Sequence, residues 1–174
     1  MQKGVVRKRR TNPPSEYGQQ LAQKQELKNQ YNLRERQLKS YIAKAVSAKG
    51  TGNTAELLMK LLESRLDSIV FRMGMAQTKK QARQMVAHGH FEVNNRLVYV
   101  PSYLVKKGDT ISLHQLSQKT TLFQNVKLAL KKYQPPPWIQ LDKEKMEGMV
   151  AAEPTLAEIA PTVELPLVFE FYSR

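Results

Sequence analysis

Cysteine is absent from this 174-residue chain, and histidine occurs only at His88, His90 and His114. Without cysteine there can be no disulfide framework, no thiolate zinc site and no cysteine nucleophile. The His88–His90 pair lacks the spacing of an H-E-x-x-H metal helix. The sequence also lacks a Walker motif, a G-x-S-x-G motif and a G-x-G-x-x-G motif after a strand. A catalytic pair of carboxylates in a cleft is the one arrangement that the sequence does not exclude. We therefore expect a protein that is no enzyme and that uses no metal, cofactor or small-molecule substrate.

Long apolar runs are equally scarce. The longest apolar clusters, near residues 69–71 and 165–171, are far shorter than the roughly 18 residues that a membrane span requires. The basic start of the chain continues into Thr11-Asn12-Pro13-Pro14-Ser15 rather than into the apolar segment of a secretory signal. We expect no membrane partner and a location in the cytoplasm, or in the matrix or stroma if the protein is organellar.

Acidic side chains are few, with 15 Asp and Glu against 28 Lys and Arg, which gives a net charge of +13. Residues 1–50 carry 12 basic and 3 acidic side chains, residues 51–114 carry 9 and 5, and residues 115–174 carry 7 and 7. Such an excess predicts a polyanionic partner, of which nucleic acid is the first candidate. The gradient indicates that the first two thirds of the chain face this partner, while the last third completes the fold or meets protein.

The first 14 residues contain Arg7-Lys8-Arg9-Arg10 followed by two prolines, and they show no apolar periodicity. This composition predicts a basic arm that is flexible until it binds. A solvated tail is the alternative.

Helical periodicity follows from Glu16 to about Lys49, with a possible break at residues 29–32. Asn53 and Glu56 then form a capping-box signal for a helix over residues 54–63. The preceding Gly50-Thr51-Gly52-Asn53 loop could hold a phosphate, although a plain connecting loop is the simpler interpretation.

Residues 64–113 are the most informative part of the chain. A short apolar helix closes at Gly74, and Thr78 with Gln81 opens the next helix as another capping box. Lys79, Lys80 and Arg83 crowd the start of that helix, where cations are unfavourable because the helix dipole is already positive there. A bound phosphate would explain this placement, and an ordinary solvated face is the alternative.

The period then changes to two. Residues 91–93 and 97–100 flank Asn94-Asn95 as a tight hairpin, and residues 110–113 form a further short strand. The unit is therefore α+β, with two helices packed on a short antiparallel sheet. Beyond it we expect a helix at residues 123–133, an edge strand at 138–141, a turn or helix around 143–149 and a docked terminal strand at 167–172.

Basic residues spread over arms, a helix start and loops favour RNA over duplex DNA, because no single recognition helix stands out. The central segment also closely resembles the RNA-binding module of the family of small-subunit ribosomal protein four. The resemblance rests on Arg65-Leu66-Asp67, Phe71-Arg72-Met73-Gly74, Thr78, Gln81-Ala82-Arg83-Gln84, His88, Val93-Asn94, Arg96, Val98 and Ser102-Tyr103. It continues on both sides, in Ser15-Glu16-Tyr17-Gly18, Gln20-Leu21, Lys24-Gln25, Glu35-Arg36-Gln37, Lys145-Met146-Glu147-Gly148 and Phe171-Tyr172-Ser173-Arg174.

This resemblance implies a structural protein that binds a multi-helix junction of small-subunit ribosomal RNA early in assembly, beside neighbouring ribosomal proteins. It implies a helical domain of residues 15–62 and 145–174, into which residues 63–144 are inserted as an α+β module with its core at 64–125. Messenger RNA would pass near the arm, residues 1–14. The implied RNA contacts are Arg7, Lys8, Arg9, Arg10, Ser15, Tyr17, Gly18, Gln20, Lys24, Gln37, Arg65, Arg72, Thr78, Lys79, Lys80, Arg83, His88 and His90. To these we add Lys28 on the basic helical surface and Lys106 and Lys107 in a loop of the module, because of their charge.

Relatives in that family usually begin earlier, often with zinc-binding cysteines, so we expect a short form without that segment. Two alternatives stay open. One is an RNA-modifying or ribosome-rescue factor that carries the same module as an appendage. The other is a role in regulating the protein's own messenger RNA, which is compatible with the ribosomal function.

Overall fold

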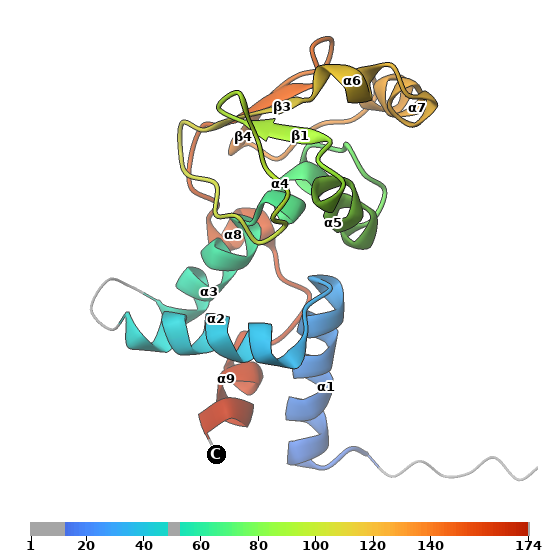
Figure 1. Cartoon of the computed structure of the whole chain (residues 1–174). Helices are drawn as coiled ribbons and strands as arrows, with labels where there is room; N and C mark the ends of the chain where they lie inside the picture. Colours follow the sequence, from blue (N-terminus) through green and yellow to red (C-terminus); the bar gives the residue numbers. More distant parts are fainter. Residues whose placement is uncertain (1–12, 49–52, 174) are drawn as a thin grey trace, which may run out of the picture.

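The computed structural model describes residues 13–48 and 53–173, which form a helical unit and a sheet-containing unit joined end to end (Figure 1). The helical unit contains α1 (Glu16–Gln30), α2 (Glu35–Ser47), α3 (Thr54–Glu63), α8 (Leu156–Ile159) and α9 (Leu165–Ser173). The second unit contains α4 (Leu66–Arg72), α5 (Lys79–Ala87), β1 (Phe91–Val93), β2 (Arg96–Leu97), β3 (Thr110–Leu113), α6 (Gln115–Gln118), α7 (Thr121–Leu130), β4 (Ile139–Asp142) and β5 (Glu147–Val150). The predicted α+β class is confirmed.

Local side-chain caps fix the starts of the N-terminal helices. Ser15 Oγ accepts a hydrogen bond from Gly18 N at 3.2 Å, and Asn53 Oδ1 accepts one from Ala55 N at 3.0 Å. The predicted break between the first two helices is confirmed, with Asn32 in the left-handed region at φ 49°. The arm at Arg7–Arg10 and the loop at 50–52 lie outside the described residues.

The chain's apolar end is a helix, so the strand predicted at residues 167–172 is wrong. Leu165 and Val168 are buried three residues apart, and Phe169 and Tyr172 continue the same face toward the helical core. Pro166 is tolerated because it lies in the first helical turn, where a backbone N–H is not needed. Packing along α1 therefore decides the conformation of a segment whose sequence alternates (Figure 1).

The sheet has the strand order β2-β1-β3-β5-β4, and every neighbouring pair is antiparallel. The predicted hairpin is confirmed, since Asn94 and Asn95 both take positive φ, at 49° and 62°. Its second strand is shorter than expected and ends at Leu97. The chain leaves the sheet there because it turns toward the start of α4, where Tyr103 O accepts a hydrogen bond from Leu66 N.

A second hairpin, β4–β5, completes the sheet. The predicted edge strand is confirmed by β4, whereas residues 143–149 form a turn and a strand rather than a helix. Asp142 Oδ1 sets the turn by accepting hydrogen bonds from Glu144 N and Lys145 N. The domain boundary expected at residue 144 falls inside this hairpin, because Val150 still packs in the core of the sheet unit.

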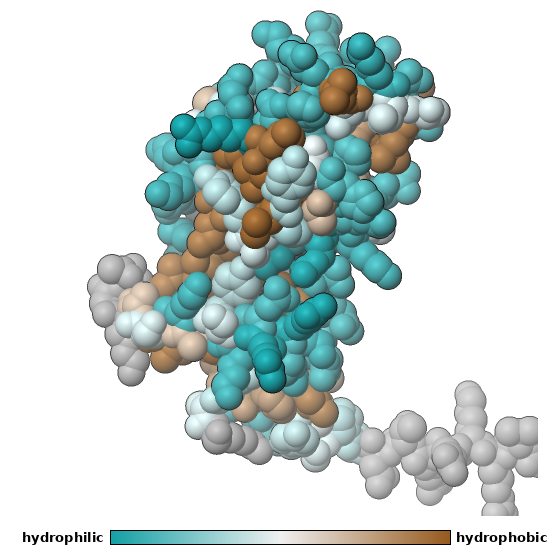
Figure 2. Space-filling view, in the orientation of Figure 1, coloured by the Kyte–Doolittle hydropathy of each residue, from teal (hydrophilic) through white to brown (hydrophobic). Residues whose placement is uncertain are grey.

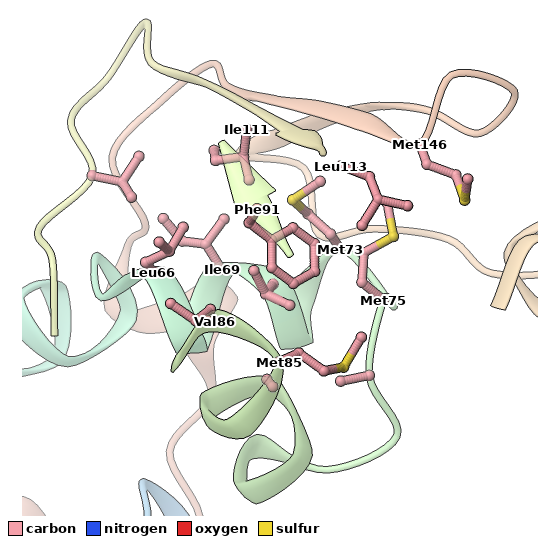
Figure 3. Packing of buried hydrophobic residues seen from close by; sticks show 14 of the residues in the cluster. Leu66, Ile69, Met73, Met75, Met85, Val86, Phe91, Ile111, Leu113 and Met146 are labelled. Atoms are coloured by element: carbon pink, nitrogen blue, oxygen red, sulfur yellow. The ribbon is translucent and has the colours of Figure 1, made fainter. Parts of the chain in front are cut away.

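Each unit has its own hydrophobic core. In the sheet unit, α4 and α5 pack on one face of the sheet through Met73, Met85 and Val86 against Phe91 and Ile111 (Figure 3). Gly148 permits this approach, since a Cβ there would lie 2.6 Å from Met73 Cε. The other core gathers Leu27, Leu38, Ile42, Leu58, Leu62, Ile159, Leu165 and Val168.

Hydrophilic residues cover most of the face seen in Figure 2. Among the described residues, no helix combines the length and the apolar character that crossing a bilayer requires.

Candidate nucleic-acid interface

A cleft of about 470 Å³ separates the start of α5 from the connection between α1 and α2. Thr78 caps α5, with Oγ1 accepting from Gln81 N at 3.1 Å, while Gln81 Oε1 accepts from Gln77 N rather than completing the predicted capping box. Apart from the ring of Phe71, the described side chains that line the cleft carry an amide, a hydroxyl or a positive charge, and none is a carboxylate: Asn29, Gln30, Asn32, Phe71, Arg72, Gln77, Thr78, Lys79 and Lys80. Free N–H groups at a helix start and such a lining suit an anion.

Glu63, at the end of α3, organises the wall of this cleft. Its buried carboxylate accepts two hydrogen bonds from Arg72, each 2.9 Å long, and one from the hydroxyl of Tyr31. Burial would raise the pKa of Glu63, but these hydrogen bonds and the charges of Lys79 and Arg72 lower it below its ordinary value. The carboxylate thus ties α1, α3 and α4 together as an anion.

Lys79 completes this network rather than facing solvent. Its Nζ lies 3.3 Å from Glu63 Oε1 and 3.3 Å from the centre of the Tyr31 ring, and its side chain is 10% exposed. Burial lowers the pKa of Lys79 to about 8 despite the attraction of Glu63. The crowding of cations at this helix start is therefore explained in part by an internal acid.

The two remaining cations at the start of α5 differ. Arg83 Nη1 donates to Asn32 O at 3.2 Å, which ties α5 to the connection between α1 and α2. Lys80 is exposed and makes no ion pair or hydrogen bond with any residue of the described ranges. Lys80 and Thr78 are consequently the groups that this helix start offers to an outside anion.

Arg65 does not lie on the surface, and its placement among the RNA contacts is corrected by its burial. The residue is 0% exposed. Its guanidinium forms a two-pronged ion pair with Asp67 and donates to the hydroxyl of Tyr41 at 2.9 Å. Arg65 therefore joins α2 to the start of α4 as an interior residue.

The RNA contacts predicted along α1 also divide into buried and exposed residues. Gln20 and Lys24 are buried: Gln20 Nε2 donates to Glu170, and Lys24 Nζ lies 3.1 Å from Glu35 Oε1 and 4.5 Å from the centre of the Phe171 ring. These contacts dock α9 on α1. Ser15 is exposed, and Tyr17 is 50% exposed.

The two histidines lie at the other end of α5. His90 Nδ1 is 2.8 Å from Ser117 Oγ, and its ring packs edge-on against Phe123. Burial and the neighbouring His88 lower the pKa of His90. The exposed ring of His88 lies nearly parallel to it, with centroids 6.2 Å apart.

The predicted contacts thus fall into four groups. Ser15, Tyr17, Thr78, Lys80, His88, Lys106 and Lys107 are exposed, while Gly18, Lys28, Gln37, Arg72, Lys79, Arg83 and His90 are partly exposed. Gln20, Lys24 and Arg65 are buried, and Arg7, Lys8, Arg9 and Arg10 lie outside the described residues. The described residues bring together no group of acidic and histidine side chains suited to a metal ion.

Sequence reasoning missed the far wall of the cleft and the acid behind it. Asn29, Asn32 and Gln77 carry no charge and belong to no motif, although the helix break was a usable signal for Asn32. Glu63 was recognisable, because it follows the buried Met59 by four residues on an otherwise apolar helix face.

Comparison with known proteins covers nearly the whole chain. Residues 1–63 match the family described as the ribosomal protein S4/S9 N-terminal domain, and residues 64–111 match the S4 domain. A small ribosomal subunit protein uS4 from Halothermothrix orenii is 45% identical over 166 residues, or 95% of this chain and 79% of that protein. The uS4 of Syntrophomonas wolfei is 42% identical over 95% of this chain and 78% of its own length. A uS4A of Alkaliphilus metalliredigens is 41% identical over 99% of this chain and 80% of its own length.

Proposed function

The chain belongs to the family of small ribosomal subunit protein uS4, and from that premise we propose which of its surfaces hold the RNA. The protein is a structural, non-enzymatic component of the small subunit that binds ribosomal RNA. An RNA-modifying or rescue factor is not favoured, because relatives of this one family align with 95% or more of the chain.

We propose that the cleft at the start of α5 holds a phosphate of this RNA. The observation that carries the proposal is that no described carboxylate lines the cleft, while Thr78 and Lys80 are exposed there. Glu63 lies behind the wall and is itself fully buried, so its charge is compensated inside the protein. The cleft therefore attracts an anion although a carboxylate lies near it.

Further exposed contacts extend this surface in several directions. Lys106 and Lys107 lie in the loop before β3, and Ser15 and Tyr17 lie at the start of α1 in the other unit. Basic contacts on one unit and hydroxyl-bearing contacts on the other suit phosphates that converge from several RNA helices. We therefore propose that the RNA element is a multi-helix junction, bound early in subunit assembly.

The remaining partners are proposals that rest on the family resemblance and on charge. Residues 115–174 carry equal numbers of acidic and basic side chains, which suits contact with neighbouring ribosomal proteins better than contact with RNA. Arg7–Arg10 would contact messenger RNA where it enters the subunit. The location would be the ribosome in the cytoplasm, as for ribosomes of bacteria such as those of the relatives.

Hydroxyl-radical footprinting of small-subunit RNA, with and without the full-length protein, tests this function. We expect protection confined to one junction, together with an affinity that falls steeply as salt rises, because phosphate neutralisation releases counterions. Diffuse protection along the whole RNA would reduce the protein to a generic basic binder and overturn the proposal.

A further inference from the structure

A groove between α5 and α7 lies next to the cleft and is chemically different from it. Two pockets, of about 270 and 180 Å³, share Gln81 and Leu122 and together follow α5 from its start to its end. Gln77 lines both this groove and the cleft, so the two are neighbours around the start of α5. Figure 1 shows α5 and α7 on the same side of the sheet unit, with α7 above α5.

The groove offers amides and rings instead of charge. Gln81, Gln84 and Asn125 supply side-chain amides, Met85 and Leu122 supply apolar surface, and no lysine, arginine or carboxylate lines either pocket. The amides of Gln84 and Asn125 make no hydrogen bond with any described residue. A surface of this kind cannot hold a phosphate by charge, but it can pair with the edge of a flat polar group.

Two imidazoles close one end of the groove. The ring of His90 is held by Ser117 and Phe123, and the exposed ring of His88 lies at an interplanar angle of 16° to it. Burial and the neighbouring His88 lower the pKa of His90, which favours the neutral form of this ring. A packed ring that lies nearly parallel to an exposed one is suited to stacking rather than to ion pairing.

We propose that the α5–α7 groove binds an unpaired nucleobase of the RNA, which stacks on the imidazoles and is read along its edge by Gln81 and Gln84, the amides that share a pocket with them. Splayed-out bases of single-stranded RNA are recognised by this combination of rings and amide groups. A peptide is less suited, because no charged group in the lining would fix its direction. The inference rests on the proposed RNA binding and adds recognition of a base to attraction of a phosphate.

The test measures binding of full-length variants to small-subunit RNA at several salt concentrations. His88→Ala and Gln84→Ala each remove one exposed groove side chain, and Gln124→Ala is the matched control because that amide lies on α7 outside the groove. We expect at least about a fivefold loss of affinity for each groove variant, with no change in the dependence on salt. The control should bind as the unaltered protein does.

Dimethyl sulfate probing supplies an independent readout, because this reagent modifies base edges that are not paired. We expect one unpaired base that the unaltered protein protects and that becomes reactive again with Gln84→Ala. Unchanged affinity of both groove variants, or a reduced salt dependence like that of a lost phosphate contact, would overturn the inference. If the unaltered protein itself bound small-subunit RNA without salt dependence, the proposed function would fail instead.

Discussion

The cations of this protein form two sets that composition does not separate. Lys24, Arg65, Arg72 and Lys79 lie inside or at the edge of the cores and pair with Glu35, Asp67 and Glu63; we call them the interior cations. Lys80, Lys106 and Lys107 are exposed, and their ammonium groups form no ion pair with any described residue; we call them the surface cations. The interior cations hold the units together, and the surface cations are available to RNA.

Desolvation explains why the two sets cannot exchange roles. Removing a charge from water costs several kcal/mol, so an interior cation is stable only beside an acid that compensates it. That same acid would repel a phosphate, so a cation cannot serve both purposes equally well. The count of 28 Lys and Arg therefore overstates the cations that the protein presents to RNA, whereas the net charge of +13 already subtracts the acids that pair with the interior cations.

Of the proposed substitutions, Glu63→Gln should lower the free energy of unfolding most, because it removes the acid that two interior cations share. Arg72 and Lys79 would lose their shared carboxylate while they stay partly buried, which should lower the free energy of unfolding by about 3–5 kcal/mol. Urea unfolding measures this loss. The control is Glu56→Gln on the same helix, where an exposed pair with Lys60 predicts a change of about 0.5 kcal/mol or less. Equal effects of the two variants would refute the role of Glu63.

Arg65 offers a second test of the same distinction. Arg65→Met should cost about 3 kcal/mol of stability, because it leaves Asp67 buried without its partner, whereas the double variant with Asp67→Leu should recover most of that loss. A double-mutant cycle by urea unfolding gives the coupling energy. Arg65→Met should leave the salt dependence of RNA binding unchanged. If Arg65→Met reduced the salt dependence of RNA binding, Arg65 would contact phosphate and would belong to the surface cations.

Sequence reasoning reached the fold more fully than the site, for a physical reason. Helix caps such as Asn53 and Thr78 and the turn at Asn94-Asn95 are local features, and the structure confirms them. The strand predicted at residues 167–172 is wrong because α1, far away in sequence, supplies the surface on which these residues pack as a helix. The β4–β5 hairpin was only half recognised, because its second strand alternates Gly148 with exposed Met149 and carries little apolar signal.

The separation of the two cation sets was not accessible from sequence. Lys79 and Lys80 are adjacent and identical in type, yet one points to Glu63 and the other to solvent. Their difference depends on an acid sixteen residues earlier, on another helix. Charge counting places both on the RNA surface, and only the packing of α3 against α4 and α5 separates them.

The lowered pKa of Lys79 also leads us to expect that the stability of the protein depends on pH. Its pKa in the folded protein is about 8, below the ordinary value of 10.5, so between these values the unfolded chain binds more protons. Stability should therefore rise from pH 8 toward pH 10, by at most about 1.4 kcal/mol per pH unit. Tyr31, whose pKa is raised, opposes this rise above pH 10. Lys79→Met should flatten the profile between pH 8 and 10, and a profile as steep as that of the unaltered protein would refute the assignment.

Lys80→Ala tests the surface set and should have the smallest effect. Loss of one phosphate contact should reduce the slope of log affinity against log salt by about one, with no measurable change in unfolding. The matched control is Lys60→Ala, because Lys60 is also a helix lysine but lies 3.1 Å from Glu153 and 3.6 Å from Glu56. Its charge is already compensated, so the salt slope should stay as it is. If both variants lowered the slope equally, pairing with an acid would not decide which cations reach RNA, and the division into two sets would fall.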